Sequence, residues 1–447
     1  MTAAEWMNRL PRGRVAATLG SAVLLIYATT STWRGLVSAD VHLTALNAWV
    51  WAQSGQPWLD GIAIGWSSPN GLPAGQLVQN GEHLASTRTP GVILAAFPLY
   101  WLIDAASFAL WPAALTAVLL GTATVVLMFL ALDSIVRRTT ALAATLVFAF
   151  ATPTWTVSAD SLWPQSISQF GIAVAAFAAS RGRWVLVGTA FGLAVLARAH
   201  VAVIAVVVAL TAAILQRRPS IAAKVISPTV LGLMVLAGLN EYRFGSFSIS
   251  GGYSYAPENL AAVGGSVVWD YLVNLAGFLV SPDRGVLLWS AAALPLVPAA
   301  IRAVKTSPSW VPAMALGGLS YTVVQIKINH FSGGDGFYGY RVGLELMTCL
   351  LPLFTAAWPL VRSEFARVVT IVLVCLQGAV FATGAISTGL FVGPDDVWRS
   401  SSVAVAAARV PALLLCLTLV SMALAVVVVR RQETARESFA DGGGPSP

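Results

Sequence analysis

One carboxylate in this sequence, Asp40, follows directly after a long apolar segment and precedes a polar, Trp-rich stretch. A carboxylate at the mouth of a membrane helix is costly to desolvate, so its presence there needs a reason. Asp is a preferred N-cap residue, and the spacing of Leu43, Leu46 and Val50 predicts an amphipathic helix that begins at Asp40 and lies on the membrane. Asp40 is therefore either a helix cap or a catalytic group at the membrane surface.

Four basic residues sit beside apolar segments in the same set of polar loops: Arg88, Arg284, Lys327 and Arg341. The N–H donors of a guanidinium form a planar fork that matches a phosphate, and a helix start also favours an anion. An arginine at a membrane boundary also extends its charged end into water without binding a ligand. The glycine-rich run before Arg341 would let backbone approach a bound group. We predict that the three arginines bind a phosphate, with Lys327 as a further basic candidate.

Other polar side chains in these loops are candidates for binding the rest of a substrate. The simpler interpretation of Glu82 is a solvated residue at a loop end, and that of Asp160 is a helix cap. Tryptophans of the first loop either stack on a ligand or anchor the loop at the membrane interface. The complete set of candidates is His42, Glu82, His83, Asp160, Tyr253, His330 and Asp335.

The sequence contains no spacing of His, Cys, Asp or Glu that is diagnostic of a metal site. We therefore predict no dedicated metal site and no defined cofactor, and we leave a divalent cation open. The three cysteines, Cys349, Cys375 and Cys416, lie in apolar runs, and their odd number argues against a disulfide framework.

The composition is that of a polytopic membrane protein. Of 447 residues, 57% are hydrophobic and only 10% are charged, whereas soluble domains carry about 25% charged residues. The net charge of +7 would also suit a nucleic-acid partner. However, Lys and Arg cluster in short loops between apolar segments, which is typical of cytoplasmic loops. We therefore expect a lipid bilayer as partner and no nucleic acid.

About twelve apolar segments reach a length that suits spanning helices. The segment 89–103 is also apolar, but we predict a re-entrant or juxtamembrane helix there, because a span would place Arg137 and Arg138 outside. The expected spans cover 15–33, 108–132, 141–157, 165–180, 184–197, 201–215, 225–239, 286–301, 310–326, 342–360, 368–386 and 411–429.

This assignment places the termini inside and the polar loops outside. We expect a cytoplasmic N-terminus (1–14), one transmembrane domain (15–430) and a disordered cytoplasmic tail (431–447). The first helix is expected to remain uncleaved, because its apolar run is longer than that of a signal peptide. Long non-repetitive outer loops are usually functional, and three are expected, near 37–88, 241–285 and 327–341.

Several short runs lie between the apolar segments. They are Ser86–Gly91, Leu162–Gln165, Asn240–Ser246 with Gly252-Tyr253, Ser281–Leu287, and Gly333-Gly334 with Tyr338–Val342. Together with the position of Asp40, they resemble the GT-C superfamily of membrane glycosyltransferases, above all bacterial protein-mannosyl and aminoarabinose transferases. Two departures are the missing histidine after Leu162-Trp163 and Asp283, which replaces a glycine.

The resemblance implies an all-α GT-C-like fold in a bacterial plasma membrane, with the active site on the extracytoplasmic face. It implies a polyprenyl-phosphate-linked sugar as donor, held by arginine or lysine, and a glycan, lipid or protein hydroxyl as acceptor. Asp40 would then take the acceptor proton in a single displacement that inverts the anomeric carbon. Arabinofuranose, mannose and an aminosugar all stay open as the transferred group.

Two other functions stay open on the sequence. A secondary transporter of an envelope precursor would also contain charges and interrupted helices, although here the charges concentrate in outer loops. A non-catalytic scaffold of envelope assembly would tolerate Asp40→Asn. We rank the transferase first, the transporter second and the scaffold last.

Overall fold

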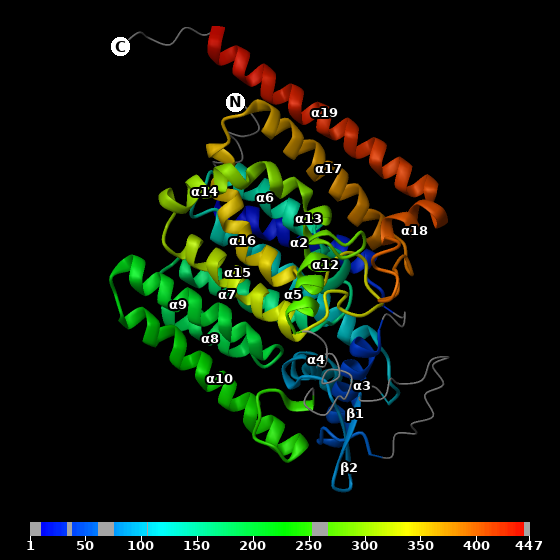
Figure 1. Cartoon of the computed structure of the whole chain (residues 1–447). Helices are drawn as coiled ribbons and strands as arrows, with labels where there is room; N and C mark the ends of the chain where they lie inside the picture. Colours follow the sequence, from blue (N-terminus) through cyan, green and yellow to red (C-terminus); the bar gives the residue numbers. More distant parts are fainter. Residues whose placement is uncertain (1–9, 34–37, 61–75, 105, 253–266, 442–447) are drawn as a thin grey trace.

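The computed structural model describes residues 10–33, 38–60, 76–104, 106–252 and 267–441, and this part of the chain is almost entirely helical (Figure 1). Within it, the sole sheet is a hairpin of β1 (Leu77–Asn80) and β2 (His83–Ser86). Gly81 turns the hairpin with a φ of 60°, a conformation that glycine adopts at little cost. The all-α polytopic class is confirmed.

Seven helices in the described ranges are long and apolar enough to cross a membrane. The remaining apolar helices are shorter than the roughly 20 residues that a straight span needs. The seven are α2 (Arg12–Thr30), α5 (Trp111–Leu132), α9 (Ala202–Gln216) with the preceding turn η2 (Ala199–Val201), α10 (Ser220–Phe244), α15 (Trp310–Ile328), α17 (Glu364–Ile386) and the apolar part of α19 (Pro411–Asp441).

Shorter elements fill the space between these helices and form their connections. The apolar ones are α4 (Pro90–Ile103), α6 (Arg138–Phe150), α8 (Trp184–Ala194), α12 (Val267–Val280) and α16 (Leu344–Ala357), which continues into η5 (Trp358–Leu360). The others are α3 (Ala39–Ser54), η1 (Thr154–Ser158), α7 (Pro164–Ala179), α13 (Val286–Trp289), η4 (Ala291–Leu296), α14 (Val297–Thr306) and α18 (Ser402–Arg409).

Two expected spans are interrupted at prolines. The segment 286–301 is divided among α13, η4 and α14, with Pro295 and Pro298 at the junction. The segment 141–157 leaves α-helix at Phe150, and after Pro153 it continues as the π-helical turn η1. Proline removes a backbone donor and clashes with the preceding turn, so an apolar run need not form one straight helix. At the C-terminus α19 continues to Asp441, into the tail expected to be disordered.

The bundle is held together by close helix contacts at small residues. Helices α8 and α10 approach at Gly188, Gly192 and Gly232, where a Cβ on Gly232 would lie 2.2 Å from the carbonyl oxygen of Gly192. Small residues four apart allow this approach in membrane helices, where burial from water does not drive association. Large apolar side chains on the outer faces of α9, α10 and α19 are exposed, as expected for surfaces that contact lipid.

Helix α3, helix α4 and the hairpin gather at one side of the bundle, and the C-terminal end of α19 lies at the opposite side (Figure 1). Ser38 is the N-cap of α3 and accepts a hydrogen bond from the Asp40 amide at 3.3 Å, so Asp40 lies in the first turn and is not the cap. Most α3 side chains are buried, including Leu43 and Leu46. The helix therefore packs much of its surface against the rest of the protein, and Asp40 lies at its start as expected, in the first turn after the Ser38 cap.

Candidate active site

The carboxylate of Asp40 lies between two arginines that come from distant parts of the chain. Its Oδ1 accepts a hydrogen bond from Arg88 Nη1, and its Oδ2 accepts one from Arg341 Nη1 at 3.1 Å. The Asp40 side chain is 21% exposed, against 7% for Arg88 and 17% for Arg341. The site is thus partly shielded but open to water, and its net charge is positive.

Both arginines act on the proton affinity of Asp40. Burial alone would raise the pKa of this carboxyl, but the charges of Arg88 and Arg341 and their hydrogen bonds outweigh it and hold the pKa below its usual value. The first turn of α3 also favours a negative charge, because unpaired N–H groups of a helix start point toward it. Asp40 is therefore ionised at neutral pH and can accept a proton.

Each guanidinium rests on a different support. Arg88 Nη2 donates to Gln76 Oε1 and, at 2.9 Å, to Thr87 Oγ1. The Arg341 guanidinium stacks instead on aromatic rings, 4.5 Å from the centroid of Trp163 and 5.4 Å from that of Phe337. Trp163 and Phe337 pack edge to face and belong to an apolar cluster that also contains Val41, the neighbour of Asp40. These two rings hold the Arg341 guanidinium in place and leave its N–H donors available to a ligand.

The other two predicted phosphate ligands lie elsewhere. Arg284 is 1% exposed, and its guanidinium donates to the carbonyls of Gly339 and Val392 at 2.8 and 3.1 Å and pairs with Asp283. Burial lowers the pKa of Arg284 to about 10, so it remains charged at neutral pH. Lys327 is exposed in the last turn of α15. Of the four, only Arg88 and Arg341 contact Asp40.

The predicted substrate-binding residues in the first loop lie in different environments. His42 is buried against Phe108, with ring centroids 4.8 Å apart, and burial lowers its pKa to about 4. His83 and Glu82 are exposed at the tip of the hairpin, where His83 stacks on Trp58 and contacts Asp60 at 2.6 Å. Among the described residues, neither Glu82 nor His83 forms a hydrogen bond or ion pair with Asp40.

The remaining candidates are also separate from Asp40 in their contacts. Asp160 accepts from the Thr32 amide at 2.8 Å and hydroxyl at 3.0 Å, and burial raises its pKa to about 6. It thereby ties the end of α2 to the segment before α7. His330 and Asp335 are exposed in the third loop, and His330 contacts Ser332. Tyr253 lies outside the described residues.

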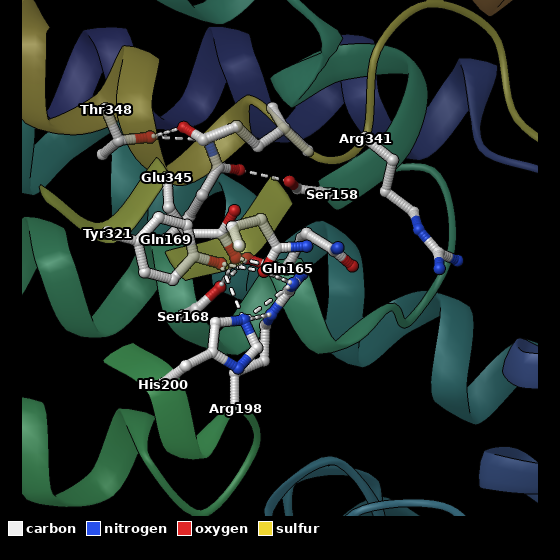
Figure 2. Close-up of polar contacts among 12 residues, drawn as sticks. Ser158, Gln165, Ser168, Gln169, Arg198, His200, Tyr321, Arg341, Glu345 and Thr348 are labelled. Carbon is white, nitrogen blue, oxygen red and sulfur yellow. Dashed lines mark hydrogen bonds and ion pairs between the residues drawn. The ribbon is translucent and has the colours of Figure 1, made fainter. Parts of the chain in front are cut away.

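A second polar group, not predicted as a unit from the sequence, is buried inside the bundle (Figure 2). Arg198 pairs with Glu345 at 3.3 Å and donates to Gln325 at 2.7 Å, while Ser168 donates to Glu345 at 2.7 Å. Glu345 is fully buried and lies in the first turn of α16, shortly after Arg341 in the chain. An acid inside an apolar segment is itself a sequence signal, because such residues are rare in membranes.

No group of three or more His, Cys, Asp or Glu side chains that could hold a metal ion occurs among residues 10–33, 38–60, 76–104, 106–252 and 267–441. Asp40 is already paired with two cations, and Asp160 with hydroxyl and amide donors. The described site therefore has the chemistry of an anion site beside a base.

Comparison with known proteins supports the fold assignment. No protein-family model and no curated protein matches the chain. The structure resembles the crystal structure of ArnT, an aminoarabinose transferase of GT-C type, from Cupriavidus metallidurans in the apo state. The TM-score is 0.51 with 16% identity, over 93% of this chain and 76% of that chain. At this identity the likeness shows the fold, and this chain has a GT-C-like membrane fold.

Proposed function

We propose that this protein is a membrane glycosyltransferase that moves a sugar from a polyprenyl-phosphate donor to an acceptor hydroxyl on the extracytoplasmic face. The observation that carries the proposal is one half-buried carboxylate held between two arginines, Arg88 and Arg341, in a GT-C-like fold. Two cations around one anion leave a surplus positive charge, which suits a phosphate. The acceptor is a glycan, a lipid or a protein.

The reaction needs one base and one anion clamp. The acceptor hydroxyl gives its proton to Asp40 as its oxygen bonds to the anomeric carbon of the sugar. The bond between that carbon and the phosphate oxygen breaks, and its electron pair leaves with the polyprenyl phosphate. Arg88 and Arg341 face the added charge on the leaving group and lower the barrier. A single displacement inverts the configuration of the anomeric carbon.

Donor binding would also strengthen the base. In the ligand-free site both arginines contact Asp40 and hold its pKa down. A phosphate that shares these guanidinium groups takes part of their charge from Asp40, so the pKa of Asp40 rises toward its usual value. Asp40 therefore accepts a proton most readily once the donor is in place. Because the pKa of Asp40 rises only when the donor binds, Asp40 takes up a proton during transfer and stays ionised in the empty site.

The test is transfer by purified full-length protein in detergent, using synthetic polyprenyl phosphates of mannose, arabinofuranose and an aminosugar with mixed acceptors. We expect wild type to transfer one of these sugars with inversion, and Asp40→Asn to bind the donor without transfer. A product that keeps the donor's anomeric configuration would exclude the single displacement. Transfer by Asp40→Asn at the wild-type rate would exclude Asp40 as base.

One observation favours the transporter as second candidate. Arg198 and Glu345 form an ion pair inside the bundle, and charges at membrane depth often lie on solute pathways. The pair is balanced one to one, and one carboxylate oxygen of Glu345 has no hydrogen-bond partner in the described part of the chain. Uptake of a soluble solute by reconstituted protein, with no transfer from any donor, would support this candidate over the transferase.

A further inference from the structure

The two arginines at Asp40 share a feature that the proposed reaction does not use. Each sits on an irregular segment whose backbone carbonyls are bound by another, deeply buried arginine. Arg243, at the end of α10, supports the segment of Arg88. Arg284, between α12 and α13, supports the segment of Arg341.

The contacts of Arg243 surround Arg88. Its Nη1 donates to the carbonyl of Arg88 itself at 2.7 Å, and its Nη2 donates to the carbonyl of Ser86 at 2.7 Å. The chain that follows α10 also packs closely against this segment, because a Cβ on Gly252 would lie 2.5 Å from Thr87 Cα. Ser86, Thr87 and Arg88 are all buried. Arg88 therefore has little freedom to shift while Arg243 is in place.

The contacts of Arg284 serve Arg341 in a similar way. Arg284 Nη1 donates to the carbonyls of Phe337 and Gly339 at 3.3 and 2.8 Å. Its guanidinium also lies 4.0 Å from the centroid of the Phe337 ring, which Arg341 contacts at 5.4 Å. Arg284 thus holds both the backbone that leads to Arg341 and one of the rings on which Arg341 rests.

Burying the guanidinium groups of Arg243 and Arg284 costs free energy, which argues that their contacts serve more than local packing. A buried charge needs compensation, and several polar groups could satisfy two carbonyls more cheaply. Arg284 has Asp283 beside it, but among the described residues no carboxylate lies within 4.0 Å of Arg243. What arginine adds is a rigid planar fork that fixes two acceptors at one distance. Such a fork suits a loop whose position must be exact to within a few tenths of an ångström.

We infer that Arg243 and Arg284 are positioning residues, Arg243 acting through Arg88 and Arg284 through Arg341, so that the two guanidinium groups converge on Asp40. The effect on sugar transfer rests on the proposed function, whereas the effect on the Asp40 site does not. Neither residue touches the carboxylate of Asp40 in the described contacts. We therefore expect Arg243 to affect the contact of Arg88 with Asp40, and Arg284 to affect the contact of Arg341 with Asp40.

The first experiment needs no substrate. The coupling between Asp40→Asn and Arg88→Ala is measured from thermal unfolding in detergent, in wild type and in Arg243→Lys, Arg284→Lys and Arg138→Lys backgrounds. Arg138 is the matched control, because it also donates to a backbone carbonyl, that of Leu10 at 2.6 Å, near the start of α2. The same series is run with Arg341→Ala in place of Arg88→Ala.

We expect Arg243→Lys to remove the coupling between Asp40 and Arg88 and to leave that between Asp40 and Arg341. Arg284→Lys should do the reverse, and Arg138→Lys should change neither. Lysine keeps the charge but lacks the rigid planar fork that holds two carbonyls at fixed positions. Arg243→Gln and Arg284→Gln serve where a lysine variant fails to fold. Equal couplings in all backgrounds, or equal losses of both couplings, would overturn the inference.

The second experiment follows kcat/KM for transfer. We expect Arg243→Lys to lower kcat/KM about 10-fold in wild type but less than about 2-fold in Arg88→Ala, because residues that act through one another are not additive. In the Arg341→Ala background, Arg243→Lys should again lower kcat/KM about 10-fold. If wild type transfers no sugar, the proposed function fails, and the unfolding experiment still decides the inference.

Discussion

Two sites in the described part of the chain hold an aspartate between two arginines, and they differ in how they are built. Asp133 pairs with Arg12 at 3.0 Å and with Arg138 at 3.1 Å, near the start of α2 and the end of α5. Its side chain is 7% exposed, compared with 21% for Asp40. Arg138 is five residues away in the chain, whereas Arg341 is 301 residues from Asp40.

The helix ends explain why the charges near Asp133 are needed for structure. Asp133 follows the C-terminal end of α5, and Arg138 opens α6. Each charge is unfavourable toward its own helix dipole, so pairing them neutralises both. Asp40 lies in the first turn of α3, where a negative charge is already favourable, and Ser38 caps the helix. The arginines at Asp40 are thus not needed to balance the charge of Asp40 on its helix. We propose that they bind an anion, whereas the arginines at Asp133 serve a structural ion pair.

The largest expected difference between the two sites is in activity. Asp40→Asn should lower kcat for sugar transfer about 10²- to 10⁴-fold, the usual contribution of a general base. Asp133→Asn, which removes an equivalent charge from the other cluster, should leave kcat within about 2-fold. The measurement is single-turnover transfer with saturating donor. Equal losses in the two folded variants would show that the activity depends on general stability.

Stability should show the opposite order. Asp133→Asn leaves Arg12 and Arg138 without their carboxylate at a nearly closed site and should cost about 2 kcal/mol. Asp40→Asn should cost about 1 kcal/mol or less, because that site is more open to water. Denaturant unfolding in mixed micelles measures both values. A larger loss for Asp40→Asn would mean that its arginines serve the fold.

Donor affinity should separate the arginines of the two sites. Arg88→Ala or Arg341→Ala should weaken binding of a polyprenyl-phosphate sugar about 10-fold, since a hydrogen bond to a charged group contributes about 1.5–3 kcal/mol. Arg12→Ala should leave the donor affinity unchanged, because Arg12 lies at the start of α2, whereas Asp40 follows the end of α2. Fluorescence titration in nanodiscs provides the dissociation constants. Equal weakening by all three variants would point to attraction by net charge alone.

The smallest expected effect is on pH dependence. The pKa of Asp40 is lowered in the folded protein, so its ion pairs stabilise the fold above the pKa of an unfolded aspartate. This contribution is lost as pH falls through the lowered value, and Asp40→Asn should remove that part of the acid dependence. In transfer, Arg341→Ala should move the acid limb of kcat/KM to higher pH, because one opposing charge is gone. An unmoved limb would assign it to another group.

Much of the architecture follows from local sequence. A bilayer imposes its demands residue by residue, so long apolar runs and polar loops predict the helices and the functional side of the membrane domain. The segment 286–301 is apolar enough to span but does not form one helix, because Pro295 and Pro298 divide it among short elements. The hairpin 77–86 was missed because its strands are short, although Asn80-Gly81 was a turn signal.

The position of Asp40 after an apolar segment marks it as a candidate, and four basic residues are candidates for binding a phosphate. The sequence could not rank them, because Arg88, Arg284 and Arg341 have similar surroundings in the chain. Packing separated them: Arg88 and Arg341 converge on Asp40, whereas Arg284 faces backbone carbonyls. Hydropathy is a local property that the bilayer enforces, but a contact across 301 residues exists only once the helices between them have packed.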